Sequence, residues 1–359
     1  MVPDEVLTAL SLATGFQKGQ LNIAPLAKGG LINHSFKMTE GSNGRSWLLQ
    51  KINTGIFKEP MDLSANYQAL YEFSKQWPGR IRIPLPVFFE KDQLLFFDNN
   101  RNAWRAMEWI QGSYTIEKVE GKEQAAEVAR TFALFTLALS KDFNAEKLMP
   151  ALPHFHDLSL RYQQFEEALT NSTAERLQQA GSLPSEMISR KTYCRLFERF
   201  KNEPANFPLR VMHHDAKIAN ILFEGSTGKV WGPIDLDTVM PGYFFSDLGD
   251  MIRSLAGSLD ENASEISSMR IREDIYEELA GNYSSVMEIE WTSEEKKLTH
   301  ASGLILVYMQ TLRFLADHLN GDIYYKINYT GQNLDRAKNQ FRLLTCLEEY
   351  LREKYAFSV

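Results

Sequence analysis

The sequence predicts an α+β fold with two lobes: a small N-terminal lobe around an antiparallel β-sheet, and a larger, mostly helical C-terminal lobe. The chain has 359 residues, which suits two hydrophobic cores better than one. Short strand-like runs dominate as far as residue 111, and long runs with helical spacing dominate after it. We therefore predict one domain over residues 1–111 and a second over residues 112–359.

The composition narrows the class of protein. The chain is 44% hydrophobic and 24% charged, as in ordinary globular proteins. Its net charge is -7 and it has no long basic block, which disfavours a nucleic-acid partner. Its start does not resemble a signal peptide, and no apolar run is long enough to span a membrane. The two cysteines form no metal or redox motif, so we expect a cytoplasmic protein. We also expect it to be a monomer or a weak dimer.

The first elements of the N-terminal lobe are predicted to be a helix over residues 2–16 and two strands within residues 23–38. The turn between these strands contains Gly29 and Gly30, and glycines let backbone amides approach a phosphate closely. Asn33 would add a side-chain donor. An ordinary hairpin turn is the alternative interpretation, because a single pair of glycines is weak evidence by itself.

The rest of this lobe is predicted as a strand, a helix and a hairpin. The strand covers residues 46–52, the helix residues 62–76, and the hairpin residues 94–97 and 103–109. Residues 108–112 would form the hinge between the lobes, although their apolar side chains suit a core position equally well.

The C-terminal lobe is predicted to consist mainly of amphipathic helices. We expect them over residues 122–140, 158–169, 185–201, 301–319 and 333–353, with an acidic helical segment over residues 260–294. Asp157 precedes the second of these helices and suits an N-cap. A metal site at the neighbouring His154 and His156 is disfavoured, because this turn supplies no third ligand.

A polar motif follows a predicted strand over residues 209–212. It contains His213, Asp215, Lys217 and Asn220 in the pattern H-x-D-x-K-x-x-N. A carboxylate in such a loop can accept or orient the proton of an attacking hydroxyl.

The chain after this motif is predicted to form a hairpin. Strands over residues 221–223 and 230–234 flank a Gly-Ser-Thr-Gly turn. The open end of such a hairpin brings Asn220 close to Asp235. If the second strand stays extended, Asp237 lies on the same face as Asp235. Amide and carboxylate oxygens gathered in one place suit Mg²⁺.

This arrangement resembles the catalytic loop and metal-binding hairpin of kinase-fold enzymes. The kinase template implies Asp215 as the base, Asn220 and Asp235 as Mg²⁺ ligands, and Lys217 near the γ-phosphate of ATP. Asp237 would act on a second metal ion or through water. The alternative interpretation is a polar turn capped by Asp and Asn, with the acidic side chains merely solvated.

The N-terminal lobe departs from the kinase pattern at one position. Kinase-fold proteins carry a phosphate-binding lysine on the strand that we predict over residues 46–52. Alternation puts Gln50 and Lys51 on opposite faces of this strand, and a one-residue slip would exchange them. Our preferred alignment places Gln50 at the lysine position and leaves Lys51 solvated, with Lys217 as the cation that compensates.

The kinase template also predicts where a nucleotide binds. The glycine turn would face the phosphates, and backbone groups of the hinge would pair with the edge of an adenine. The predicted nucleotide-binding residues are Gly29, Gly30, Asn33, Gln50, Glu108 and Ile110.

Charged residues continue beyond the hairpin. Asp247 suits the N-cap or the first turn of a helix. Asp250 and Arg253 are three residues apart, so they share a helix face. We expect them to form a scaffold ion pair beneath the active site.

Seven stretches, in order along nearly the whole chain, closely resemble the N-acetylhexosamine 1-kinases within the aminoglycoside phosphotransferase and choline kinase superfamily. They are GGLIN (Gly29 to Asn33), INTGIF (Ile52 to Phe57), HFHD (His154 to Asp157), HHDAKIANIL (His213 to Leu222), IDLDTVMPG (Ile234 to Gly242), DLGDMIR (Asp247 to Arg253) and RFLADHLNGDIYY (Arg313 to Tyr325).

The resemblance implies that ATP and Mg²⁺ are used to phosphorylate the anomeric hydroxyl of a hexosamine, with Asp215 as the catalytic carboxylate. It also implies that Arg313 and Tyr324 bind the sugar, and that Gln50 is compatible with activity. From the residues alone, Arg313 would instead pair with Asp317 one turn away, and Tyr324 would be a half-buried surface ring.

Two other functions remain open at this level. The same chemistry could serve an aminoglycoside, choline or another small alcohol, although we find no set of aromatic residues for a choline cage. A nucleotide-binding pseudokinase is favoured only by Gln50 and disfavoured by the intact Asp215, Asn220 and Asp235. The sequence does not select among hexosamines, which differ in the orientation of single hydroxyls.

Overall fold

A computed structural model describes residues 2–26, 32–41, 44–76 and 81–359. The chain divides into two compact units. The first, here called the sheet unit, comprises residues 1–115, 141–153 and 220–240. The second, the helical unit, comprises residues 116–140, 154–219 and 241–359. The α+β class with one sheet-based and one helical part is therefore confirmed, while the functional division at residue 111 stays a prediction.

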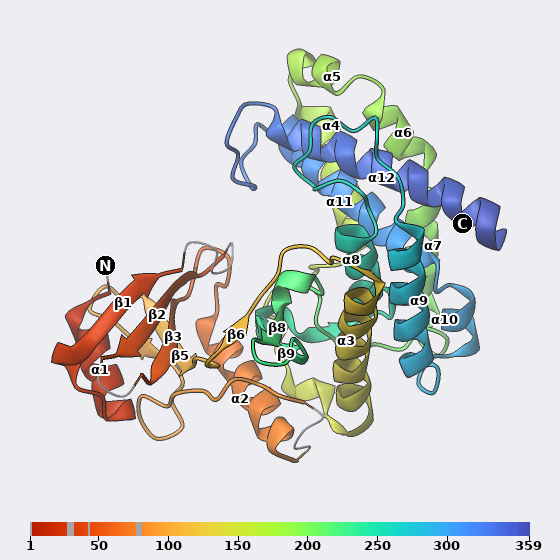
Figure 1. Cartoon of the computed structure of the whole chain (residues 1–359). Helices are drawn as coiled ribbons and strands as arrows, with labels where there is room; N and C mark the ends of the chain where they lie inside the picture. Colours follow the sequence, from red (N-terminus) through yellow and green to blue (C-terminus); the bar gives the residue numbers. More distant parts are fainter. Residues whose placement is uncertain (1, 27–31, 42–43, 77–80) are drawn as a thin grey trace. The chain divides into compact units, whose positions relative to one another are not determined.

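An antiparallel five-stranded sheet forms the centre of the sheet unit (Figure 1). The strand order is β1-β2-β3-β5-β4, in which every neighbouring pair is antiparallel. The strands are β1 (Leu21–Pro25), β2 (His34–Glu40), β3 (Ser46–Lys51), β4 (Phe96–Phe97) and β5 (Ala103–Glu108). All lie where sequence periodicity predicts them.

Two helices accompany this sheet. The helix α1 (Asp4–Thr14) buries Val6 and Leu10 in one apolar core with Trp47 and Leu49 of β3. The helix α2 (Pro60–Gln76) buries its predicted apolar positions, Leu63, Leu70 and Phe73. Burial of a large apolar side chain contributes roughly 1.5–3 kcal/mol, so these stripes fix both helices. The short helices η1 (Lys18–Gln20) and η2 (Ala145–Lys147) also belong to this unit.

A second, three-stranded sheet carries the predicted hairpin. Its order is β6-β8-β9, with β6 (Ser113–Tyr114), β8 (Ile221–Glu224) and β9 (Val230–Pro233). The hairpin is confirmed, but the extended path expected through Asp237 is wrong. The strand ends at Pro233, Asp235 has a left-handed backbone with φ 62°, and Leu236–Thr238 form the 3-10 helix η4. Asp235 and Asp237 therefore do not share a strand face.

The helical unit is built around α11 (Ala301–Leu319), which is buried along nearly its whole length and packs against α4, α8 and α12. Figure 1 shows these helices gathered together. Its other elements are α3 (Lys122–Asp142), α4 (Leu158–Asn171), α5 (Ala174–Ala180), α6 (Leu183–Ser189), α7 (Thr192–Asn202), β7 (Arg210–Met212), α8 (Phe245–Leu255), α9 (Glu273–Met287), α10 (Ser293–Lys297) and α12 (Gln332–Tyr355). Along the chain, boundaries between the units fall within η3 (Ile218–Asn220) and β10 (Met240–Gly242).

Two helix predictions need correction. Residues 185–201 form two helices instead of one, with a break at Arg190, whose guanidinium turns to Glu348 of α12 at 2.9 Å. The acidic segment over residues 260–294 is helical only in α9 and at the start of α10. The N-cap prediction is confirmed, since Asp157 accepts a hydrogen bond from the Leu160 amide at 3.1 Å.

No helix among the described residues is long and apolar enough to cross a bilayer.

Candidate active site

The predicted catalytic loop follows β7 in the helical unit. The Lys217 ammonium lies 2.8 Å from Oδ2 of Asp215, so the predicted base and the predicted cation form a direct ion pair. Both side chains remain partly accessible, with 26% of Asp215 and 34% of Lys217 exposed. In contrast, the strand that leads into the loop is fully buried. An accessible carboxylate on a rigid support is what a substrate-binding base requires.

Asp247, in the first turn of α8, holds this loop from behind. Its carboxylate is fully buried and accepts hydrogen bonds from the backbone amides of His213 at 3.0 Å and His214 at 2.8 Å. A third bond comes from the Thr136 hydroxyl at 3.2 Å. Burial raises the pKa of Asp247, while these donors oppose the rise. The sequence predicted its position in the helix but not this role.

His214 occupies a strained position beside the base. Its backbone is left-handed with φ 66°, which is unfavourable for a residue with a Cβ. Its ring Nδ1 lies 3.2 Å from Nδ1 of His156. Gly242 leaves the space that the ring fills, because a Cβ there would lie 2.4 Å from a ring carbon of His214. His156 and Gly242 thus both contact His214, the residue directly before Asp215.

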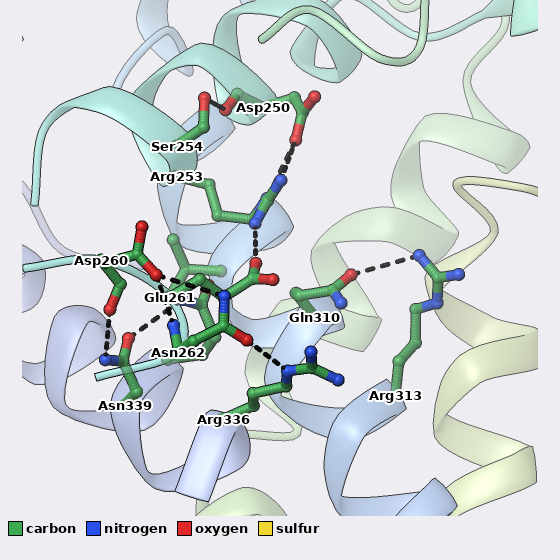
Figure 2. Close-up of polar contacts among 12 residues, drawn as sticks. Asp250, Arg253, Ser254, Asp260, Glu261, Asn262, Gln310, Arg313, Arg336 and Asn339 are labelled. Atoms are coloured by element: carbon green, nitrogen blue, oxygen red, sulfur yellow. Dashed lines mark hydrogen bonds and ion pairs between the residues drawn. The ribbon is translucent and has the colours of Figure 1, made fainter. Parts of the chain in front are cut away.

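The predicted scaffold pair is confirmed in the helical unit. Arg253 contacts Asp250 at 2.9 Å and also pairs with Glu261, as Figure 2 shows. Burial raises the pKa of Asp250, and the nearby Asp215 carboxylate adds to the rise, although Arg253 opposes it. Glu261 was not identified from the sequence, because the predicted helical segment over residues 260–294 gave no reason to pair it with Arg253.

Arg313 lies among aromatic rings rather than in an ion pair. Its guanidinium carbon is 5.4 Å from the centroid of Phe155 and 5.5 Å from that of Tyr325. Its Nη1 donates to Oε1 of Gln310 at 3.1 Å (Figure 2). The Gln310 amide donates to the Tyr325 hydroxyl at 3.3 Å. Among the described residues, Arg313 has no carboxylate partner, so the expected pair with Asp317 is absent.

Asp317 instead holds the loop that carries Tyr324. Its oxygens accept the backbone amides of Ile323, Tyr324 and Tyr325 at 2.8 to 3.0 Å, and the Asn333 side chain donates to the same carboxylate. Tyr324 itself is 65% exposed. Its ring centroid lies 6.0 Å from the Arg313 guanidinium. The two residues predicted to bind the acceptor are therefore neighbours.

A cavity of about 310 Å³ lies beside this pair, at the lower end of the range for small-molecule sites. Its lining includes Arg161, Asn171, Arg313, Asn320 and Tyr324. Burial and the nearby Arg313 charge lower the pKa of Arg161. The lining also contains the carboxylates of Glu167 and Asp317, so two arginines and two acidic residues line the cavity together with amide and hydroxyl groups.

The backbone segments that carry two predicted metal ligands, Asn220 and Asp235, lie next to each other at the hairpin end in the sheet unit. The Ile234 amide donates to the carbonyl of Asn220 at 2.9 Å, which places Asn220 next to the start of Asp235's turn. Asp235 is exposed, so its carboxylate is accessible. One amide and one accessible carboxylate fit Mg²⁺, which takes few protein ligands and fills its shell with water and phosphate oxygens. Three or more His, Cys, Asp or Glu side chains do not cluster as a metal site anywhere in the described parts of the chain.

The third predicted ligand, Asp237, has other partners in this structure. Its two oxygens face the two terminal nitrogens of Arg105, and Asn33 donates to the same carboxylate at 2.9 Å. The Arg105 Nε donates to Gln50 at 2.9 Å. Burial alone would lower the pKa of Arg105, but the Asp237 charge raises it. Arg105 was missed from the sequence.

The other predicted nucleotide-binding residues have simpler surroundings. The Glu108 amide and carboxylate both bond the backbone of Leu85, and the Ile110 carbonyl accepts from Ser113. Gly29 and Gly30 lie outside the described residues. Nucleotide binding by these residues stays a prediction.

Solved structures of similar fold belong to phosphotransferases and small-molecule kinases. An aminoglycoside phosphotransferase from Alicyclobacillus acidocaldarius has a TM-score of 0.62 at 14% identity, covering 99% of this chain and 97% of that chain. A microcompartment-associated aminopropanol kinase has a TM-score of 0.60 at 12% identity, with 98% of each chain covered. A spectinomycin phosphotransferase, solved with ADP and spectinomycin, has a TM-score of 0.50 at 13% identity, covering 95% and 99%.

The sequence itself gives the family. Residues 23–280 match the model of the phosphotransferase enzyme family, APH. This match covers well over half of the chain and contains the predicted catalytic loop, the hairpin with the predicted metal ligands, and Asp247. The chain therefore belongs to the phosphotransferase enzyme family.

Proposed function

We propose that the protein transfers the γ-phosphate of ATP to the anomeric hydroxyl of an N-acetylhexosamine. Family membership supports phosphoryl transfer, and the bound ADP of one structural neighbour supports a nucleotide donor. The choice of acceptor rests on the surroundings of Arg313. This residue lies beside Tyr324 and lines a polar cavity, and among the described residues its guanidinium has no carboxylate partner. A guanidinium in this setting hydrogen-bonds neutral oxygens, such as sugar hydroxyls and an acetamido carbonyl.

The mechanism assigns separate tasks to the residues of each unit. Asp215 accepts the proton of the sugar hydroxyl and orients its oxygen for in-line attack on the γ-phosphorus, so that ADP leaves. Lys217 neutralises charge on the transferring group. Asn220 and Asp235 would hold Mg²⁺, whose charge stabilises the phosphates of ATP. Positioning and electrostatic stabilisation supply most of the catalysis in such a reaction.

Charge argues against a cationic acceptor. Aminoglycosides, choline and aminopropanol carry positive charge at neutral pH, and a site for them needs unpaired carboxylates. Here Asp250 and Glu261 are both paired with Arg253. Two arginines, Arg161 and Arg313, line the cavity with two carboxylates. Of these, Asp317 accepts three backbone amides, and Glu167 accepts the side-chain amide of Gln163 at 2.8 Å. A neutral sugar is therefore favoured over an amine.

The test is turnover of ATP with a panel of acceptors: N-acetylglucosamine, N-acetylgalactosamine, glucose, galactose, choline, kanamycin and none. We expect turnover with the N-acetylated sugars. The Arg313→Gln variant should raise the KM for the sugar at least about tenfold, the cost of one charge-assisted hydrogen bond, with the KM for ATP unchanged. Arg195→Gln, which removes an exposed arginine, is the matched control. Turnover with choline or kanamycin alone would contradict the proposed acceptor.

A further inference from the structure

We propose that Arg105 is a positioning residue for the metal-binding turn, and that it provides the fixed cation that this chain lacks at Gln50. This inference rests on the proposed function, because it assumes a magnesium-dependent transfer from ATP. All the contacts that support it lie within the sheet unit. It goes beyond the kinase template, in which a lysine of the third strand pairs with a glutamate of the following helix.

The sheet register places the two residues side by side. Gln50 of β3 pairs directly with Arg105 of β5, so their side chains leave the sheet on the same face. The Gln50 carbonyl oxygen accepts from Arg105 Nε at 2.9 Å, and the Gln50 amide donates to the Ser35 hydroxyl at 3.0 Å. Gln50 therefore orients the guanidinium, since Nε can only donate and needs an acceptor.

The Arg105 guanidinium binds the carboxylate of Asp237 through two hydrogen bonds. Its two terminal nitrogens face the two carboxylate oxygens, with Nη2 to Oδ2 at 2.8 Å, which is the fork geometry that only arginine provides. Asn33 donates to the same carboxylate at 2.9 Å and accepts from the Asn53 amide at 3.0 Å. Arg105, Asp237 and Asn33 are each less than a tenth exposed, so solvent screens this network little.

The Arg105–Asp237 ion pair constrains Asp235 through the backbone that connects the two aspartates. Asp237 lies in η4, the 3-10 helix that begins directly after Asp235. Asp235 has the left-handed φ of 62°, a conformation that persists only when surrounding contacts enforce it. The Arg105–Asp237 pair and the buried side chain of Leu236 both hold η4 in place. Asp235, directly before η4, is exposed.

The template's lysine–glutamate pair has no counterpart among the described residues. The Lys51 amine makes no ion pair there, and Glu72 of α2 is bound to Lys75 on the surface. The hydrogen-bonded link therefore runs from the sheet directly to the metal-binding turn, while α2 packs against η4. A lysine at position 50 would place a second cation against Arg105 Nε and remove its acceptor. We therefore expect Gln50→Lys, which restores the usual kinase residue, to damage the enzyme.

The test compares the magnesium dependence of Arg105→Lys, Arg105→Met, Asp237→Asn and Gln50→Lys, with Arg101→Met as a charge-removal control on the same hairpin. Calorimetry measures ATP binding with and without Mg²⁺, and turnover is titrated with Mg²⁺. We expect each of the four variants to need at least about ten times more Mg²⁺ for half-maximal rate, a conservative value for a misplaced ligand. In the Arg105 and Asp237 variants, acceptor KM and magnesium-free ATP binding should stay within about threefold, because neither depends on Asp235.

A double-mutant cycle separates positioning from direct metal binding. If Arg105 acts through Asp237, Arg105→Met combined with Asp237→Asn is no worse than the more damaging single change. Additive losses would overturn the proposal, because Asp237 would then act independently of Arg105. Magnesium dependence unchanged in folded Arg105→Lys would overturn it too, as would collapse of activity in Lys51→Gln, which would make Lys51 the functional cation.

A double variant distinguishes loss of folding from loss of metal positioning, and the wild-type enzyme distinguishes failure of this proposal from failure of the proposed function. Arg105→Met with Asp237→Leu replaces the buried ion pair by an apolar pair, an exchange that folded proteins often tolerate. A folded double variant with the same magnesium defect supports the proposal, and one with normal magnesium dependence overturns it. A wild type that binds ATP with Mg²⁺ but phosphorylates no sugar would refute the acceptor and leave the Arg105 test intact.

Discussion

One carboxylate oxygen of Asp247 accepts the backbone amide of His214 at 2.8 Å, directly before the proposed base in the chain. The other oxygen takes the neighbouring amide of His213. A buried carboxylate thus fixes the backbone that delivers Asp215, and the position of the base depends on a residue that need not touch the substrate.

Asp247→Asn should therefore reduce activity without abolishing the fold. Only one oxygen remains as an acceptor, so one buried amide loses its partner at a cost of about 1–3 kcal/mol. We expect kcat to fall at least about tenfold and the melting temperature to drop, measured by steady-state kinetics and calorimetry. Asp274→Asn, an exposed first-turn acid of α9, should change neither. Wild-type kcat in Asp247→Asn would contradict the support role.

Gly242→Ala should displace the His214 ring. The added Cβ would lie 2.4 Å from a ring carbon, closer than side chains tolerate. We expect loss of stability of about 1–3 kcal/mol, as for other overpacked sites, together with reduced kcat. Gly281→Ala in α9 is the opposite control, because its Cβ meets nothing within 4 Å and alanine favours a helix by about 1 kcal/mol. Equal stability changes in the two variants would contradict the steric argument.

Asp317→Ala should loosen the loop that carries Tyr324. The change removes the acceptor of three backbone amides. We expect the KM for the acceptor to rise at least about tenfold, with ATP binding unchanged, because the loop belongs to the predicted acceptor site. Ile323→Ala on the same loop, where the side chain is 81% exposed, should have little effect. Hydrogen exchange should report faster opening of residues 323–325 only in Asp317→Ala.

Acid should destabilise the protein through His156. Burial, the neighbouring His214 and the Arg313 charge lower the pKa of His156 well below its ordinary 6.5. Below pH 6.5 His156 is protonated in the unfolded chain but stays neutral in the folded protein. The contribution of His156 to the free energy of unfolding is therefore fully present above this pH and falls as the pH decreases. The slope is up to about 1.4 kcal/mol per pH unit for this group. Urea unfolding from pH 8 to pH 5 should show a shallower slope in His156→Gln than in His154→Gln, which changes an exposed ring.

Local rules predicted the hairpin and its convergent ends well. The Gly-Ser-Thr-Gly turn between two apolar strands was enough to bring Asn220 to the start of the Asp235 turn. Helical spacing likewise predicted α11 to the residue. These features depend on neighbours in the sequence, so a single sequence contains the information that determines them.

Features that depend on distant partners were not predictable in this way. Arg105 and Asp237 are 132 residues apart, and only the folded sheet brings them together. Aspartate tolerates the left-handed backbone of Asp235 better than most residues do, but only a small minority of aspartates adopt it, so the sequence did not reveal it. Periodicity likewise suggested that Arg313 pairs with Asp317, but the loop amides compete for that carboxylate and take it.

The position of the new phosphate ester tests the central claim most directly. The enzyme would be incubated with ATP, Mg²⁺ and N-acetylglucosamine labelled with carbon-13 at its anomeric carbon, and the product analysed by phosphorus NMR. We predict a phosphate signal split by the labelled carbon, and no such product from Asp215→Asn. An ester on any other carbon, or an unlabelled product formed only when an amino alcohol is supplied, would contradict the account.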